Sequence, residues 1–92
     1  GRAEEAIAYY ARVYGNYPAY PRRAVCLFLQ GFVYETQLHN IEKARAIYTD
    51  FLLKYPGHEL AADVKITIEN LGKSDEELIR MFEEKNAAAR TN

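Results

Sequence analysis

The sequence predicts an all-α fold of about five antiparallel helices in a single domain. Apolar residues recur every three or four positions in five segments, which is the pattern of amphipathic helices. No segment alternates apolar and polar residues as a half-buried strand does. A chain of 92 residues is one domain at most, and it buries a modest core.

The first predicted helix spans residues 2–14 and ends at Gly15-Asn16, before two prolines. The second spans residues 22–37 and is apolar on more than one side, so we expect it to be covered on both. Gly31 lies in its interior, where glycine costs about 1 kcal/mol relative to alanine. We therefore expect a neighbouring helix to approach Gly31 closely, with Ala44 as the contact.

The third predicted helix spans residues 41–54, with Asn40 as its N-cap, and Pro56-Gly57 ends it. The fourth spans residues 59–71 and is followed by Gly72 as the C′ residue. Its inward residues are predicted to be Leu60, Ala61, Val64, Ile68 and Leu71.

The fifth predicted helix begins after Ser74, which has capping-box spacing to Glu77, and runs to about Lys85. It is predicted to bury Leu78, Ile79, Met81 and Phe82. Residues 86–92 are expected to fray as a tail.

The chain contains an internal repeat. Residues 4–18 align with residues 42–56 at an offset of 38, which places Tyr17-Pro18 on Tyr55-Pro56. The fifth helix fits the same register at an offset of 34, with Phe82 on Tyr48. Self-similarity at this period is typical of helical solenoids, in which two helices alternate along the array.

The stretch from residue 27 to residue 56 resembles a tetratricopeptide repeat. The residues that occupy the positions of the family pattern are Leu27, Gln30, Gly31, Tyr34, Ala44, Tyr48 and Pro56, with Leu27 in place of the tryptophan and Gln30 in place of the leucine. The resemblance implies antiparallel helical hairpins in a right-handed superhelical array. It divides residues 1–85 into a half repeat (2–18), a full repeat (22–56) and a shortened capping pair (59–85). Gln30 departs from the pattern at an apolar core position, and the fourth helix lacks the glycine.

The family resemblance implies a non-catalytic scaffold that binds a protein or peptide segment on its concave face. The positions that match this face are Val25, Phe28, Phe32, Glu35, Thr36, Asp63, Ile66 and Asn70. Two alternatives remain open: a structural oligomerisation or spacer module, and an accessory domain of a larger protein.

The long linkers ending in Tyr-Pro are similar to those of tetratricopeptide proteins of the bacterial cell envelope. Those proteins work with the Tol–Pal system or in outer-membrane protein assembly. This similarity implies a periplasmic or envelope location, with a cytoplasmic one still open.

Tyrosines are concentrated near the N-terminus, where Tyr9 and Tyr10 lie on a helix without a preceding partner helix. If that face is uncovered, it predicts association with another copy or with upstream repeats, because exposed apolar patches mark interfaces. Alternatively, these tyrosines pack against the second and third helices.

The chain opens inside a predicted helix without an initiator Met, which suggests a piece of a longer protein with Gly1 as a cloning remnant.

Several other functions are disfavoured by composition. A net charge of −1, with Arg22-Arg23 as the one adjacent basic pair, argues against nucleic-acid binding. No apolar run reaches the length of a membrane span, and no signal peptide is evident. Cys26, His39 and His58 are the residues that invite catalytic or metal proposals, but no third ligand has suitable spacing. The sequence therefore predicts no enzyme activity, no metal and no cofactor.

Overall fold

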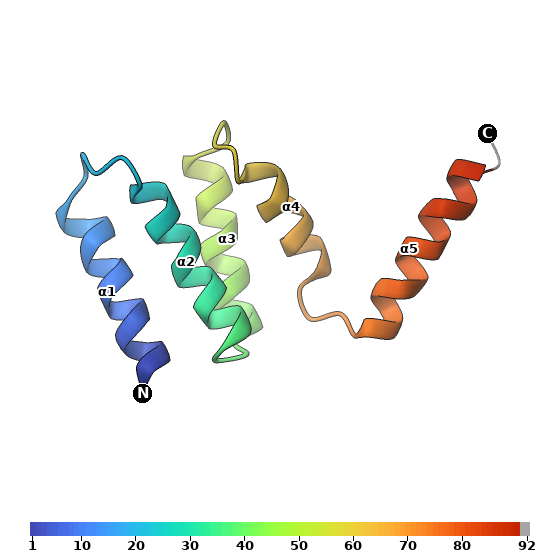
Figure 1. Cartoon of the computed structure of the whole chain (residues 1–92), viewed down its shortest axis with the longest axis horizontal. Coiled ribbons are helices and arrows are strands. Elements are labelled where there is room, and N and C mark those ends of the chain that lie inside the picture. The colour runs from blue at the N-terminus through green and yellow to red at the C-terminus, as the bar shows by residue number, and fades with distance from the viewer. Residues whose placement is uncertain (91–92) are drawn as a thin grey trace.

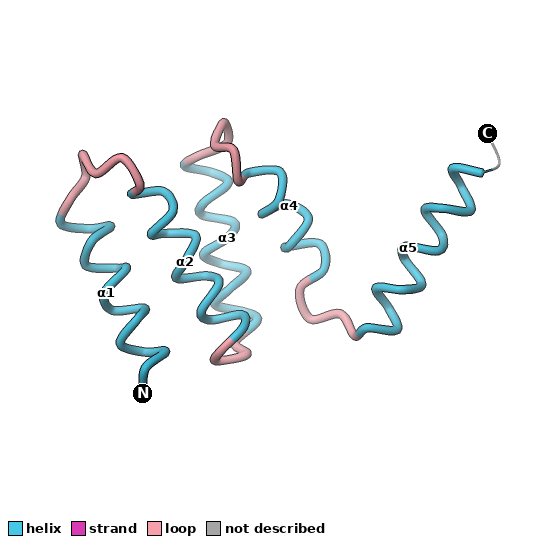
Figure 2. Tube along the Cα trace, in the orientation of Figure 1, coloured by secondary structure: helices cyan, strands magenta, loops and turns pink. Residues whose placement is uncertain are grey.

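The computed structural model describes residues 1–90, which form five helices joined by short loops (Figures 1 and 2). The helices are α1 (Arg2–Asn16), α2 (Arg23–Thr36), α3 (Ile41–Lys54), α4 (Ala61–Asn70) and α5 (Asp75–Arg90). Within residues 1–90 no strand is present. From α1 to α4 each helix packs against the next, running up and down in turn. The predicted all-α array of helical hairpins is confirmed.

Local signals set the ends of several helices. The Asn40 side chain accepts a hydrogen bond from the Lys43 backbone N–H at 3.1 Å, as an N-cap does. Ser74 Oγ likewise accepts from the backbone N–H of Glu77 at 3.2 Å. Gly72 has a φ of 76°, the left-handed conformation expected after a helix. All three caps were predicted from the residue types.

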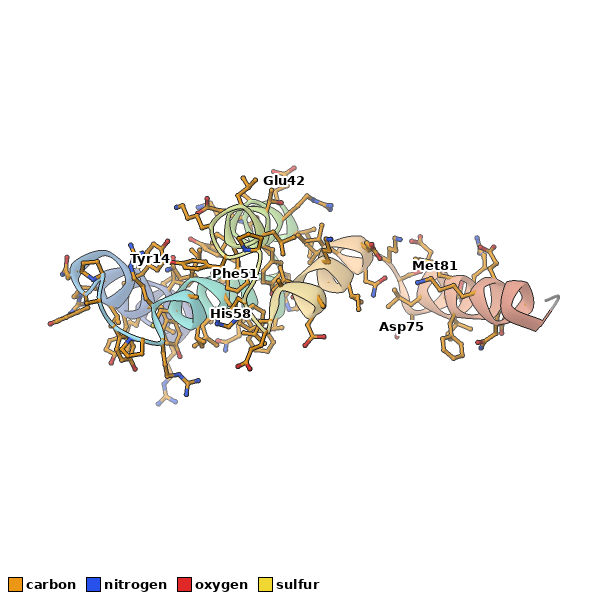
Figure 3. All side chains as sticks on the ribbon, turned by 90° about the horizontal axis from the view of Figure 1, so that it is seen from above. Tyr14, Glu42, Phe51, His58, Asp75 and Met81 are labelled. Atoms are coloured by element: carbon orange, nitrogen blue, oxygen red, sulfur yellow. The ribbon has the colours of Figure 1, made fainter. Side chains whose placement is uncertain are left out.

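The core lies between α2, α3 and α4. Tyr48, Phe51 and Val64 are fully buried there, and the ring of Phe51 contacts the ring of His58 at a centroid distance of 5.4 Å (Figure 3). The residues predicted to face inward from the fourth helix are all buried or half-buried, as expected from their spacing. Burial of these apolar side chains is the main source of stability for the array.

Gly31 lies in the closest approach between α2 and α3. A Cβ atom placed on Gly31 would come within 2.7 Å of Cε1 of Tyr48 and 3.3 Å of Cγ2 of Ile47. The prediction of close packing is therefore confirmed, and the nearest contacts are Tyr48 and Ile47 rather than the predicted Ala44. The large ring of Tyr48, one helical turn beyond Ala44, occupies the space that a side chain at position 31 would need.

A cluster of polar and aromatic groups joins the first three helices. Arg23 Nε donates to the Tyr14 carbonyl oxygen at 2.8 Å, and its Nη1 donates to the Tyr55 hydroxyl oxygen at 3.1 Å. The guanidinium also lies over the Tyr14 ring, 4.0 Å from its centroid. Burial, followed by the hydrogen bond with Tyr14, raises the pKa of Tyr55. These contacts of Arg23 fix the positions of α1, α2 and the end of α3 relative to one another.

The helix α5 departs from the predicted packing. It points away from the rest of the chain (Figures 1 and 3), and it makes no extended contact with α1–α4. Ile79 and Phe82 are 57% and 67% exposed, so the prediction that they are buried is wrong. The helix continues to Arg90, beyond the predicted end at Lys85, and the final two residues of the predicted tail lie outside the described residues.

The surface of α4 that α5 would have to cover explains why α5 does not pack on it. At the repeat offset of 38, Lys65 and Glu69 stand where α2 has Leu27 and Gly31, the residues that receive α3. Both Lys65 and Glu69 are exposed. Packing an apolar helix over them would remove two charged groups from water without partners, which is costly. The charges of Lys65 and Glu69 therefore disfavour the packing of α5 on α4.

Candidate functional site

An open groove lies between α1, α2 and the loop that joins them. Its volume is about 880 Å³. The residues that line it are Tyr9, Tyr10, Arg12, Val13, Asn16, Tyr17, Pro18, Ala19, Tyr20, Arg22, Val25, Cys26 and Leu29. We call this surface the tyrosine groove.

The internal repeat explains why the tyrosine groove is apolar. At an offset of 38, its residues Tyr9, Tyr10, Val13 and Tyr17 correspond to Ile47, Tyr48, Phe51 and Tyr55 of α3 and its cap. In α3 this surface is covered by α2, which packs over Tyr48 through Gly31. Among the helices of residues 1–90, α2 alone packs extensively on α1; it borders one side of the groove and leaves the corresponding surface of α1 open. The tyrosine groove thus exposes on α1 the kind of apolar surface that a neighbouring helix covers on α3.

Charge in the tyrosine groove is of one sign. Arg12 and Arg22 are among the lining residues, and none of the lining residues is acidic. Tyr17 is 60% exposed, and its hydroxyl gives an aromatic surface with a polar end. This combination suits an apolar segment flanked by carboxylates.

Three of the concave-face residues predicted on α2 are partly used inside the fold. Phe28 packs on Tyr48 and Phe51, with ring centroids 5.8 and 6.3 Å apart. Glu35 accepts a hydrogen bond of 2.8 Å from the Tyr48 hydroxyl, so its carboxylate is not a free charge. The hydroxyl of Thr36 donates to the carbonyl oxygen of Phe32, one turn earlier in the same helix.

The remaining predicted residues fall into two places. Val25 lines the tyrosine groove, whereas Phe32 stacks on Phe28 at 6.1 Å and is 43% exposed. On α4, Asp63 and Ile66 are exposed and Asn70 is half-buried. None of the α4 residues lines the tyrosine groove.

The two tyrosines predicted for self-association are placed together. Tyr9 and Tyr10 form an edge-to-face pair with centroids 5.7 Å apart, and both line the tyrosine groove. Sequence reasoning missed Arg12, Tyr17 and Tyr20 as groove residues. The repeat offset contained the signal for Tyr17, because it aligns Tyr17 with the half-buried Tyr55.

Cys26, His39 and His58 do not form a reactive cluster. Cys26 is buried at the base of the tyrosine groove. His58 Nδ1 accepts a hydrogen bond from the Leu60 backbone N–H at 3.0 Å, so it caps the turn before α4. His39 lies in the α2–α3 turn with a φ of 51°. Among the described residues, no group of three His, Cys, Asp or Glu side chains is placed to hold a metal ion.

One segment of the chain matches a known protein family. Residues 25–58 match the family model of the tetratricopeptide repeat. The match covers most of α2, all of α3 and the turn into α4, and it supports the full repeat inferred from Gly31, Tyr48 and Pro56. Tetratricopeptide repeats generally mediate protein–protein interaction. No curated protein and no solved structure was found to match the chain. In the described part of the chain, each helix is too short or too polar to cross a bilayer.

Proposed function

We propose that this chain is a non-catalytic interaction scaffold that binds a segment of a protein partner in the tyrosine groove. The observation that carries the proposal is the groove itself: it exposes on α1 the surface that α2 covers on α3. An apolar helix surface of this kind is stable when another chain segment removes it from water. Binding requires no chemical step.

The tyrosine groove is favoured over the α2–α4 surface first expected from the family resemblance. On that surface Phe28 packs on Tyr48 and Glu35 accepts a hydrogen bond from it, so Phe32 and Ile66 are its exposed large apolar side chains. Hot spots of protein interfaces are clusters of aromatic and arginine side chains in a concave region. The tyrosine groove has four tyrosines and two arginines in such a region.

A peptide-display selection on the purified chain tests this function and requires no named partner. We expect enrichment of peptides with apolar residues at helical spacing and acidic neighbours. Their affinity should fall at least tenfold with Tyr17→Asp and should be unchanged with Ile66→Asp, an equally exposed site on α4. A selection without consensus, or peptides that bind both variants equally, would contradict the proposal.

The envelope location implied by the Tyr-Pro linkers belongs to the same proposal. Its support is the Tyr-Pro ending of both α1 and α3 before each linker. Fractionation of a cell that carries the full-length protein tests it: recovery with the periplasm or envelope is expected, and recovery in the cytosol alone contradicts it.

A further inference from the structure

We propose that the occupant of the tyrosine groove is α5 of a second copy of this chain. The inference rests on the proposed function, since it names the partner of the same groove. It joins an uncovered apolar surface at each end of the described chain. The result is a two-fold dimer in which each copy supplies one groove and one helix.

The groove is shaped for a helix rather than for a compact ligand. Four of its residues, Tyr9, Tyr10, Val13 and Tyr17, align at an offset of 38 with the residues of α3 and its cap that face α2, whereas the lining residue Arg12 aligns with Asp50. The volume of about 880 Å³ is near the upper end for small-molecule pockets, which are roughly 300–1,000 Å³. An amphipathic helix that presents residues at i, i+3 and i+4 is the standard occupant of such a surface.

The helix α5 has the matching apolar stripe. Leu78, Ile79 and Phe82 fall on one face at i, i+1 and i+4, and they border a shallow hollow that includes Glu83, Asn86 and Ala87. Ile79 and Phe82 are exposed although they are among the most apolar residues of the chain. An amphipathic helix in water is normally covered on this face. Packing of α5 on α4 of its own chain is disfavoured, because the charged Lys65 and Glu69 occupy two of the receiving positions.

The charges of the two surfaces are complementary. Along α5, Asp75, Glu76 and Glu83 lie on or beside the apolar stripe on the side of Ile79, and Lys85 lies at its other edge beside Leu78, so the stripe is bordered by more acidic than basic groups. The groove presents Arg12 and Arg22, and no acidic residue lines it. Complementary charges at the rim of an interface orient the partner and disfavour the reverse docking.

The α5 helix lies too far from the tyrosine groove of its own chain to fill it. The tyrosine groove lies at the N-terminal end of an elongated molecule with extents of 51, 31 and 15 Å, and α5 lies at the other end (Figure 1). The helix therefore cannot reach its own groove. Two copies side by side in opposite directions place each α5 beside the groove of the other, which closes the assembly.

Sedimentation velocity of the 92-residue chain across a concentration series tests the proposal. Phe82→Asp places a charge on the helix, Tyr17→Asp places one in the groove, and both side chains are exposed in the monomer. Leu53→Asp, at a site on α3 that is 78% exposed, is the matched control. We expect wild type and Leu53→Asp to dimerise equally, and each of the other variants to weaken dimerisation at least tenfold.

A mixture of the two variants gives the decisive result. Phe82→Asp keeps an intact groove and Tyr17→Asp keeps an intact helix, so an equimolar mixture regains one of the two contacts. We expect it to associate more strongly than either variant alone. A monomeric wild type, a dimer insensitive to either variant, or a mixture without recovery would overturn the proposal. If display-selected peptides still bind the groove in those cases, the proposed function survives and the second-copy partner fails.

Discussion

The ring of Tyr48 lies directly against the backbone of Gly31. The position that a Cβ on Gly31 would take is 2.7 Å from Cε1 and 2.9 Å from Cδ1 of that ring. The same approach brings the Tyr48 hydroxyl to 2.8 Å from Oε1 of Glu35, one turn further along α2. One glycine thus allows a fully buried tyrosine to pack and to satisfy its hydroxyl.

Gly31→Ala is expected to destabilise the fold despite the better helix propensity of alanine. Propensity favours alanine by about 1 kcal/mol, whereas overpacking against a buried ring costs about 1–3 kcal/mol. The expected net loss in the free energy of unfolding is about 1 kcal/mol. Gly15→Ala is the control, because nothing lies within 4 Å of its new Cβ and it should stabilise α1. Urea unfolding measures both, and a stabilised Gly31→Ala would contradict the account.

Tyr48→Phe is expected to change how stability depends on alkaline pH. Burial, followed by the hydrogen bond to Glu35, raises the pKa of Tyr48 above its ordinary value. A raised pKa in the folded state gives stability that is complete below the unfolded-state value of about 10 and is lost as pH rises above it. The free energy of unfolding of wild type should therefore fall above pH 10, by up to about 1.4 kcal/mol per pH unit for this group.

In Tyr48→Phe, the free energy of unfolding should lack the part of the fall above pH 10 that Tyr48 causes in the wild type. At pH 7 it should lose about 1 kcal/mol, because the hydrogen bond is removed while Glu35 remains half-exposed to water. The raised pKa of Tyr55 contributes to both proteins alike. Identical pH dependence of wild type and variant in urea unfolding would show that Tyr48 is not the responsible group.

Arg23→Lys is expected to loosen α1 from the array. A lysine cannot bond both the Tyr14 carbonyl and the Tyr55 hydroxyl, nor stack its charge as a planar group. We expect a loss of about 1–2 kcal/mol. Hydrogen exchange should report it as faster exchange of the α1 amides with little change in α3, and Arg45→Lys on the exposed side of α3 should have no effect.

Phe28→Ala and Phe32→Ala are expected to differ in stability although they are one turn apart. The Phe28 ring contacts two fully buried side chains, so its removal leaves a cavity and should cost about 2–3 kcal/mol. Phe32 is largely at the surface, so its loss should cost less than about 1 kcal/mol. Equal losses in thermal unfolding would contradict this division, and only Phe32→Ala is suited to binding tests.

The parts of the fold that sequence reasoning predicted depend on neighbouring residues. Apolar spacing located all five helices, and Asn40, Ser74 and Gly72 marked ends because capping acts within one turn. The close packing at Gly31 was also predictable, since a glycine inside an apolar helix needs a compensating contact. Its partner was not predictable, because Ala44 and Tyr48 lie on the same face of α3 and only the crossing of the helices decides between them.

The detached α5 was missed because amphipathic spacing shows that a helix has an apolar face and does not show what covers it. Lys65 and Glu69, aligned with Leu27 and Gly31, contained the missing information. The candidate site was partly predicted: Val25, Tyr9 and Tyr10 line the tyrosine groove. Glu35, predicted to lie on the concave face, instead accepts a hydrogen bond from the Tyr48 hydroxyl across the helix pair.

The most direct test of a groove filled by α5 of a second copy is a filtered NOE experiment on a mixture of isotope-labelled and unlabelled chains. Only contacts between copies give signals in this measurement. The account predicts cross-peaks from the Phe82 ring to the Val13 methyl groups and to the Tyr17 ring. Cross-peaks between copies that connect Phe82 to α4, or the absence of any between α5 and α1, would contradict it.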